Sequence, residues 1–166
     1  MNVNIAGTIK HSSVNGPGVR YVLFMQGCPH RCEGCQNPET HNPEGGTVMD
    51  TEQIIGDILE TRFIDGVTLS GGDPFMQPEA TLEICRRLRE KGIDLWVYTG
   101  YLFESIYAGE IGETARKVLD YCDVLVDGKF VKALLSDRTV YRGSSNQRLV
   151  DLKKSLEEGK AVTFKP

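Results

Sequence analysis

The sequence has no long apolar run and no excess of positive charge. Its strongest apolar stretch near the start, "YVLFM", has five residues, whereas about 20 are needed to span a bilayer. The formal net charge is −4, so no overall basic field is available to gather nucleic acid. We therefore expect neither a membrane nor a nucleic acid among the partners of this protein.

A secretory signal, internal repeats and low-complexity linkers are also missing. The opening "MNVNIAGTIKHSS" lacks a basic region followed by an apolar run, which a secretory signal requires. We expect a soluble, cytoplasmic protein. The chain has 166 residues and is 40% hydrophobic, which suits a single domain over 1–166.

Cysteine is scarce and unevenly distributed. Of the five cysteines, three fall within "GCPHRCEGCQN" at 27–37. An odd, crowded set does not suit a disulfide framework and favours a metal site at Cys28, Cys32 and Cys35. Thiolates are ligands for iron–sulfur clusters, zinc or copper(I). Three thiolates on a cubane leave one iron without a protein ligand, and that iron is able to bind a ligand that comes and goes.

The main structural alternative is a zinc ion completed by His30 or His41. Zinc loops usually pair two knuckles at a distance, and no second cysteine pair exists here. Cys85 lies on the apolar stripe of a predicted helix, so we expect it in the core, and we expect a structural role for Cys122. A three-cysteine cluster that only transfers electrons is a further alternative.

Strand, loop and helix patterns alternate along the chain. Apolar runs predict strands at 19–27, 65–74, 94–100 and 123–130. A loop rich in Asn, Pro and Gly is expected up to about residue 49. Capping and periodicity predict helices at the following places: after Asp50, with Gln53 in a capping box; from Pro78 to about Lys91, stopped by Gly92; across 102–121, broken near Gly109 and Gly112; and in "DLKKSLEEG". A further strand is expected in "QRLVD" or "AVTFK", and we expect Trp96 and Tyr98 in the core.

This alternation predicts an α/β fold with a mainly parallel sheet. A closed eight-unit barrel needs about 250 residues, so we expect an incomplete, open-sided (β/α) barrel of about five to six units, or an open twisted sheet. Glycine or cysteine loops follow the strands at 27–37, 71–74, 99–100 and 127–129. The carboxyl ends of such strands are where binding sites form, so we expect these loops to share one site.

The motif "CPHRCEGC" resembles the cluster loop of the radical S-adenosylmethionine enzymes, whose signature is C-x3-C-x2-C after the first strand. The resemblance implies that Cys28, Cys32 and Cys35 hold a 4Fe–4S cluster, and that the amino and carboxylate groups of S-adenosylmethionine chelate its fourth iron. Gly34 departs from the family, which often has an aromatic residue there. The backbone of Gly34, Cys35 and Gln36 is expected to line the adenine instead.

"SGGDP" at 70–74 taken alone is a glycine turn in which Asp73 caps the next segment. It resembles the segment of the same family that receives the methionine ammonium group of the cofactor. The resemblance implies that Gly71, Gly72 and Asp73 bind S-adenosylmethionine.

"DGK" at 127–129 would by itself be a solvated loop. It matches the Asp-x-Lys of glycyl-radical activating enzymes, a branch of the same superfamily. The resemblance implies that Asp127 and Lys129 contact the cofactor, with Lys129 paired to its carboxylate. No catalytic residue beyond the cluster ligands is expected.

Two other segments narrow the resemblance. "NGPGVR" at 15–20 is similar to the opening of activating enzymes. "RGSSNQR" at 142–148 is only a polar loop by composition, but it resembles a segment of the proteins that activate anaerobic ribonucleoside-triphosphate reductase. Surface Arg142 and Arg148, or the loop 36–49, are candidates for docking that partner.

The resemblance implies a specific reaction. A reduced flavodoxin-like protein supplies an electron to the cluster, and the C5′–S bond of S-adenosylmethionine breaks to give a 5′-deoxyadenosyl radical. That radical takes a hydrogen atom from a glycine of the reductase, which keeps the resulting glycyl radical. The alternative within this class is activation of another glycyl-radical enzyme, such as pyruvate formate-lyase.

Overall fold

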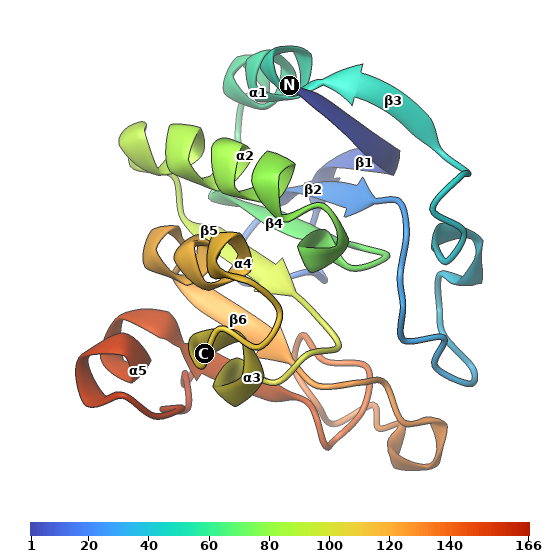
Figure 1. Ribbon diagram of the computed structural model, residues 1–166, viewed down its shortest axis with the longest axis vertical. Coiled ribbons are helices and arrows are strands. Elements are labelled where there is room, and N and C mark those ends of the chain that lie inside the picture. Colours follow the sequence, from blue (N-terminus) through green and yellow to red (C-terminus); the bar gives the residue numbers. More distant parts are fainter.

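Seven strands form one continuous, open sheet in the computed structural model, which describes residues 1–166 (Figure 1). Their order across the sheet is β3-β1-β2-β4-β5-β6-β7. The strands are β1 (Asn2–Ser12), β2 (Arg20–Met25), β3 (Thr47–Asp50), β4 (Gly66–Gly71), β5 (Leu95–Tyr98), β6 (Val124–Asp127) and β7 (Arg148–Asp151). The central strands β2, β4, β5 and β6 run parallel, while β1, β3 and β7 pair antiparallel to their neighbours. The prediction of an open α/β sheet that does not close into a barrel is confirmed.

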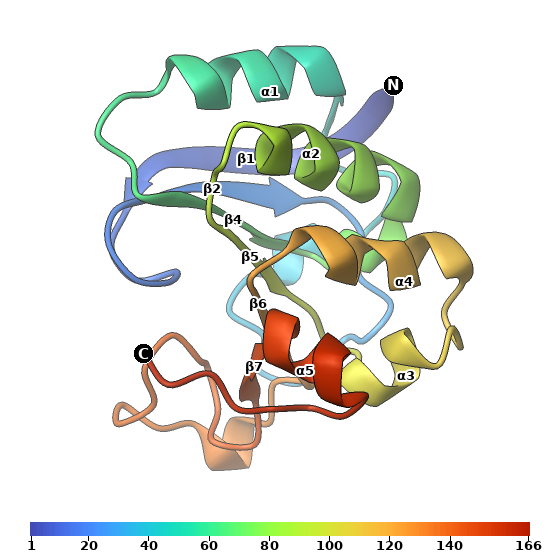
Figure 2. The ribbon, with the colours of Figure 1, turned by 90° about the vertical axis from the view of Figure 1, so that its left-hand side faces the viewer.

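The helices lie on one face of this sheet. Figure 2 shows α1, α2, α4 and α5 in front of the strands. Their bounds are α1 (Thr51–Glu60), α2 (Pro78–Glu90), α3 (Phe103–Tyr107), α4 (Glu113–Val118) and α5 (Leu152–Glu158). The longest, α2, has 13 residues, and no helix combines the length and the apolar character that crossing a bilayer requires.

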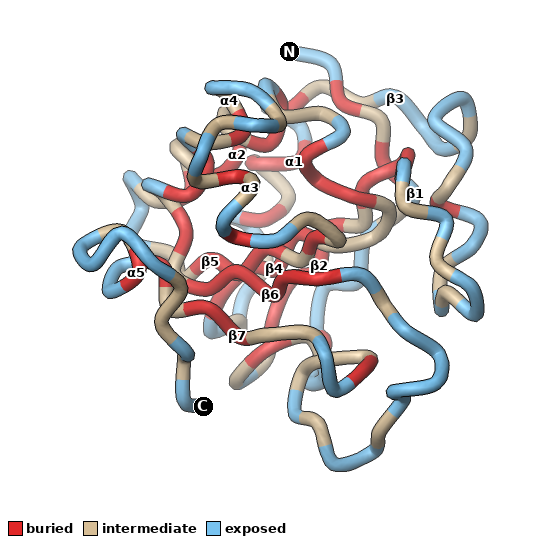
Figure 3. Tube along the Cα trace, turned by 60° about the horizontal axis from the view of Figure 1, so that its bottom comes forward, coloured by how far each residue is buried: buried red, intermediate tan, exposed pale blue.

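The side chains of the parallel strands point alternately to the face of the sheet that the helices cover and to the opposite face. Leu69 of β4 lies opposite Leu23 and Val97 on its neighbours, and these side chains are fully buried under the helices. One residue earlier, Thr68 lies opposite Trp96, which belongs to a separate small cluster. Because successive side chains alternate, the second row points away from the helices. Figure 3 shows the central strands as the most buried part of the chain, with exposed loops at their ends.

Local sequence signals account for the helix ends. Asp50 accepts a hydrogen bond from the amide of Glu52 and forms the predicted capping box with Gln53. Pro78 occupies the first turn of α2, as expected. The predicted break near Gly109 and Gly112 separates α3 from α4.

Two strands were not predicted, and both lie toward the edge of the sheet beyond β2. The prediction of a loop up to about residue 49 is wrong at its end, since β3 begins at Thr47. Strand β1 shows little apolar alternation because Val3 and Ile5 are its only buried apolar residues. Strand β3 buries none of its four side chains, so neither strand gives a strong pattern.

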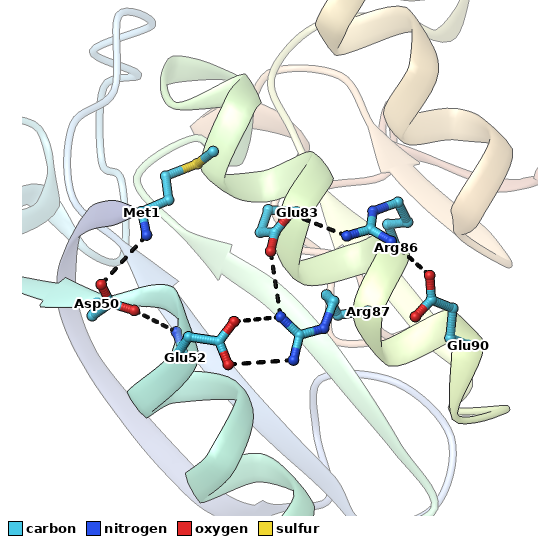
Figure 4. Close-up of polar contacts among 7 residues, drawn as sticks. All are labelled: Met1, Asp50, Glu52, Glu83, Arg86, Arg87 and Glu90. Carbon is cyan, nitrogen blue, oxygen red and sulfur yellow. Dashed lines mark hydrogen bonds and ion pairs between the residues drawn. The ribbon is translucent and has the colours of Figure 1, made fainter.

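An ion-pair network on the surface joins α1 to α2 (Figure 4). Arg87 on α2 donates to both carboxylate oxygens of Glu52 on α1 and contacts Glu83 one turn away. The hydrogen bond from Arg87 lowers the pKa of Glu52. Arg86 pairs with Glu90 at 2.6 Å, and the amino group of Met1 lies 3.4 Å from Asp50. Such exposed pairs each contribute little to stability, so this network is a small supplement to the core.

Candidate functional site

The three clustered cysteines line one cavity of about 130 Å³ at the carboxyl ends of the central strands. Cys28, Cys32 and Cys35 come from the loop after β2, and each is partly exposed. His30 and His41 of the same connection after β2 also line it. The remaining lining residues come from the ends of β4 and β5 and from the connection between β6 and β7: Ser70, Gly71, Gly72, Tyr98, Thr99, Gly100, Gly128, Phe130 and Gln147. The structure therefore brings together the loops that the sequence placed at one site.

The cysteine loop is bent by residues with positive φ. Gly27 and Gly34 have φ values of 99° and 73°, and the non-glycine Arg31 has a φ of 48°. A left-handed conformation is uncommon for a residue such as arginine and tends to occur at functional sites. These bends turn the three thiols toward the same space.

Burial and backbone amides act in opposite directions on the first thiol. Burial raises the pKa of Cys28, while the backbone amides of His30 and Arg31 partly oppose that rise. The amide of Asn37 approaches the sulfur of Cys35 at 3.4 Å. Amide donors of this kind stabilise a thiolate, which is the form that binds a metal.

Two glycines at the cavity are required by close contacts. A β-carbon on Gly72 would lie 2.2 Å from the carbonyl oxygen of Gly27, and one on Gly100 would lie 2.4 Å from the ring of His30. Neither space admits a larger residue. The strand ends therefore approach the cysteine loop as closely as the backbone allows.

Asp73 was predicted to lie beside the cofactor ammonium, but its carboxylate is not part of the cavity wall. The side chain is fully buried and accepts hydrogen bonds from His30 at 2.6 Å and from the hydroxyl of Thr99 at 2.8 Å. The amides of Phe75 and Gly100 also donate to it, at 2.9 and 3.0 Å. Gly71 and Gly72 of the same motif do line the cavity.

Asp127 and Lys129 are not gathered at the cavity either. Asp127 is fully buried and accepts hydrogen bonds from the amide of Phe103 and from the guanidinium of Arg148. The bond to Asp127 is the main cause of the raised pKa of Arg148, which also pairs with Glu104. Lys129 is exposed, and its neighbours Gly128 and Phe130 line the cavity in its place.

Two residues that line the cysteine cavity, Gln147 and Tyr98, were not predicted as site residues from the sequence. Gln147 accepts from the amide of Gly143 at 2.8 Å and donates to the carbonyl of Gly128 at 2.9 Å, so it ties the two ends of the connection between β6 and β7 together. Tyr98 was expected in the core, but it stands at the cavity wall and donates to the carbonyl of Tyr141. Burial raises the pKa of Tyr98 well above its usual value. Trp96 and Cys85 are buried, as predicted.

The cavity continues into a groove on the uncovered face of the sheet. A hollow of about 160 Å³ adjoins it through Cys35, Tyr98 and Gln147, which line both. A larger hollow of about 420 Å³ shares Tyr98 and Gln36 with the middle one and is flanked by the exposed side chain of Val14. A path therefore leads from the surface to the cysteines.

The residues present fit an iron–sulfur cluster with an additional ligand. Three cysteine side chains line one cavity together with several glycines, so thiolate ligands and close backbone contacts are available in the same place. The Nε2 atom of His41 is buried there without a hydrogen-bond partner in the protein, which a group filling the cavity would supply. No three His, Cys, Asp or Glu side chains are gathered closely enough for a single metal ion. A cubane needs a wider spacing, since each thiolate binds a different iron.

A family model agrees with this donor set. Residues 14–150 match the family model of the 4Fe-4S single cluster domain. Among solved structures, the crystal structure of QueE from Escherichia coli is similar with a TM-score of 0.49 and 16% identity, over 60% of this chain and 53% of that chain.

Curated relatives match most of the chain. A protein of Escherichia coli (strain K12) is 42% identical over 143 residues, covering 81% of this chain and 89% of its own length. A protein of Enterobacteria phage T4 is 43% identical over 145 residues, covering 82% and 86%, and one of Haemophilus influenzae is 39% identical over 142 residues, covering 81% and 88%. All three carry the name anaerobic ribonucleoside-triphosphate reductase-activating protein. The chain belongs to this family of reductase-activating proteins and contains its 4Fe-4S single cluster domain.

Proposed function

We propose that this protein activates an anaerobic ribonucleoside-triphosphate reductase by generating a glycyl radical on it. The observation that carries the proposal is the convergence of Cys28, Cys32 and Cys35 on one cavity walled by glycine backbone. The family supports the identity of the target, since its members are named for activating this reductase.

In this proposal the three cysteines hold a 4Fe–4S cluster, and S-adenosylmethionine occupies the remaining iron. The carbonyl-rich turn at Gly71 and Gly72 suits the cofactor ammonium, because the absence of side chains lets backbone oxygens approach it. When bound, the cluster and cofactor supply reductive cleavage of the C5′–S bond and a 5′-deoxyadenosyl radical that removes hydrogen from a glycine Cα.

The protein's own residues orient the cofactor and its surroundings. Cys35 lines both the cysteine cavity and the adjoining hollow, and Gln36 lines the two outer hollows. These positions support the proposal that Cys35 and Gln36 border the adenine, while Gly34 lines none of these three hollows. The buried carboxylates of Asp73 and Asp127 would act indirectly, by holding the loops around the cavity in place. Lys129 is exposed beside the cavity, and we propose that its ammonium group pairs with the cofactor carboxylate.

The groove on the uncovered face is proposed to admit the glycine-bearing segment of the reductase. The glycine must come within about 3–3.5 Å of the reacting atom, which requires ordered docking. Arg142 and Arg148 are poor candidates for recognising the partner, because Arg142 donates to the carbonyl of Gln147 and Arg148 is paired with Asp127 and Glu104. The loop 36–49 beside the cysteines is the better candidate.

Three further elements belong to the proposal. Residues 1–166 would act as one radical S-adenosylmethionine domain. A reduced flavodoxin-like protein would supply the electron, and the reaction would take place in the cytoplasm. The exposed rim of the cysteine loop supports electron entry, since Glu33 and Gly34 in that loop are exposed.

The test is an anaerobic reconstitution with iron and sulfide, followed by reduction and addition of S-adenosylmethionine and the reductase. We expect methionine and 5′-deoxyadenosine together with a glycyl doublet in the electron paramagnetic resonance (EPR) spectrum of the reductase. Pyruvate formate-lyase in a parallel sample should remain without a doublet. Cleavage of the cofactor with a doublet only on pyruvate formate-lyase would contradict the assigned partner. A stable cluster that never cleaves the cofactor would instead indicate an electron-transfer protein.

A further inference from the structure

We infer that His30 is a positioning residue that fixes the cysteine loop to the ends of β4 and β5 through Asp73. The inference rests on the proposed function of the cavity as the cluster site. His30 lies between Cys28 and Cys32 in the sequence, and the proposed cluster does not need it as a ligand.

The His30–Asp73 contact is short and shielded from water. The Nε2 atom of His30 lies 2.6 Å from Oδ2 of Asp73, and their side chains are 6% and 0% exposed. Hydrogen bonds to a carboxylate are stronger than neutral ones, and low local dielectric strengthens them further. This contact joins residues 43 positions apart in the sequence.

Asp73 links His30 to the segments that follow β4 and β5. Besides His30, it accepts hydrogen bonds from the amide of Phe75 after β4, and from the hydroxyl of Thr99 and the amide of Gly100 after β5. A carboxylate held by four donors is fixed in position. His30 therefore docks against a rigid acceptor.

Packing holds the imidazole ring in a single orientation. The ring of Tyr101 meets it edge to face, with 4.6 Å between centroids. Gly100 lies so close to the ring that a β-carbon there would clash with it. The ring thus fits a slot formed by the two residues that follow Thr99.

The remainder of the cysteine loop has few other attachments. The amide of Cys28 bonds to the carbonyl of His41 at the start of the loop, and the amide of Cys35 bonds within the loop to Cys32. Between residues 29 and 36, the His30–Asp73 contact is the sole hydrogen bond that links a loop residue to the strand ends. Loss of this contact should free Cys32 and Cys35 to move relative to Gly71 and Gly72.

The test compares two substitutions at one site. His30→Phe keeps a ring against Tyr101 but removes the donor, whereas His30→Gln keeps an amide donor. His11→Phe is the matched control, because His11 is exposed and bonds to the carbonyl of Arg62 on another part of the surface. Each protein is reconstituted anaerobically, and two quantities are measured: the rate of iron release to a chelator, and the concentration of S-adenosylmethionine that half-saturates the change in the EPR spectrum of the reduced cluster.

We expect His30→Phe to release iron about tenfold faster than the wild type, in the range known for groups that orient metal ligands. It should also need a higher cofactor concentration, while His30→Gln recovers part of both properties and His11→Phe matches the wild type. The cluster-free proteins should all still unfold cooperatively, with a lower unfolding temperature in His30→Phe because the buried carboxylate of Asp73 loses a donor. A cooperative transition separates positioning from failure to fold. Wild-type iron release and cofactor response in His30→Phe would overturn the inference, as would an equal defect in His30→Gln. These readouts need no reductase, so a missing glycyl doublet with the wild type would count against the proposed function alone.

Discussion

On the face of the sheet that the helices cover, apolar side chains join into a core of 26 buried residues, whereas the opposite face holds a cluster of four. Crossover connections between the parallel strands place the helices on the same side, so only that side is sealed. The other side remains open for a groove that leads to the cysteines. One sheet therefore separates the residues that stabilise the fold from those that form the site.

The uncovered face is stabilised by a different kind of contact. The buried guanidinium of Arg20 bonds to Thr68 at 2.8 Å and to the carbonyl of Val67 at 2.9 Å, and it lies over the ring of Trp96. Its charge contacts Asp94 at 2.8 Å. Burial raises the pKa of Asp94, although Arg20 opposes that effect. A polar network thus replaces the helices that would otherwise cover this face.

The largest expected effect comes from the cysteine loop. Replacing Cys28, Cys32 or Cys35 with Ala should abolish cluster binding and cofactor cleavage, because three thiolates are the minimum donor set for the proposed cluster. The cluster-free fold should persist, since none of the three belongs to the core. Iron content and 5′-deoxyadenosine yield measure the effect. Cys85→Ala is the control, and full activity in Cys32→Ala would contradict the assignment.

Substitutions on the helix-covered face should instead lower the stability of the fold. Leu69→Ala removes a fully buried side chain from the core and should lower the free energy of unfolding by about 2–5 kcal/mol. Tyr98→Phe on the groove side removes one hydrogen bond and should cost only about 1 kcal/mol. Urea unfolding of the cluster-free proteins tests both. An equal loss in the two variants would break the distinction between the faces.

Two glycine-to-alanine substitutions, one at the cavity and one in a helix, should also have different effects. Gly72→Ala would force a β-carbon against the carbonyl of Gly27 and separate the end of β4 from the cysteine loop, so binding of S-adenosylmethionine should weaken. Gly56→Ala in the interior of α1 meets open space and should stabilise the protein by up to about 1 kcal/mol. Cofactor titration monitored by EPR and urea unfolding measure the two outcomes. Unchanged cofactor affinity in Gly72→Ala would argue against the close approach at the cavity.

The smallest effect is expected from the surface network between α1 and α2. Arg87→Gln should lower the unfolding temperature slightly, and the difference from the wild type should shrink at high salt. Because Arg87 lowers the pKa of Glu52, this contribution is fully present above the usual Glu value of 4.5 and is lost as the pH falls from there through the lowered pKa of Glu52. Thermal unfolding across pH and salt tests this. A difference that persists at pH 3 and high salt would show that Arg87 contributes by packing instead.

Much of the fold follows from local sequence patterns, and the exceptions have clear physical causes. The central strands are continuous apolar runs, and α1 begins at a capping box, so both were predicted. Strands β1 and β3 were missed because they bury few side chains.

The site was predictable to a similar extent. The cysteine spacing and the glycine loops at strand ends indicated which segments meet. The hydrogen bonds between these loops could not be predicted from the sequence. Asp73 pairs with His30 and Asp127 pairs with Arg148, and each pair is too far apart in the chain to produce a local sequence pattern. The sequence therefore indicated which loops meet at one cavity, but not the direction in which the carboxylates of Asp73 and Asp127 point.

The most direct test of the account is the EPR spectrum of the anaerobically reconstituted, reduced wild-type protein before and after S-adenosylmethionine is added, with iron, sulfide and zinc measured on the same sample. We expect iron and sulfide in the proportions of one 4Fe–4S cluster per chain and a spectrum that changes when the cofactor binds to the open iron. A zinc-containing protein without sulfide, or a cluster whose spectrum is unaffected by the cofactor, would contradict it.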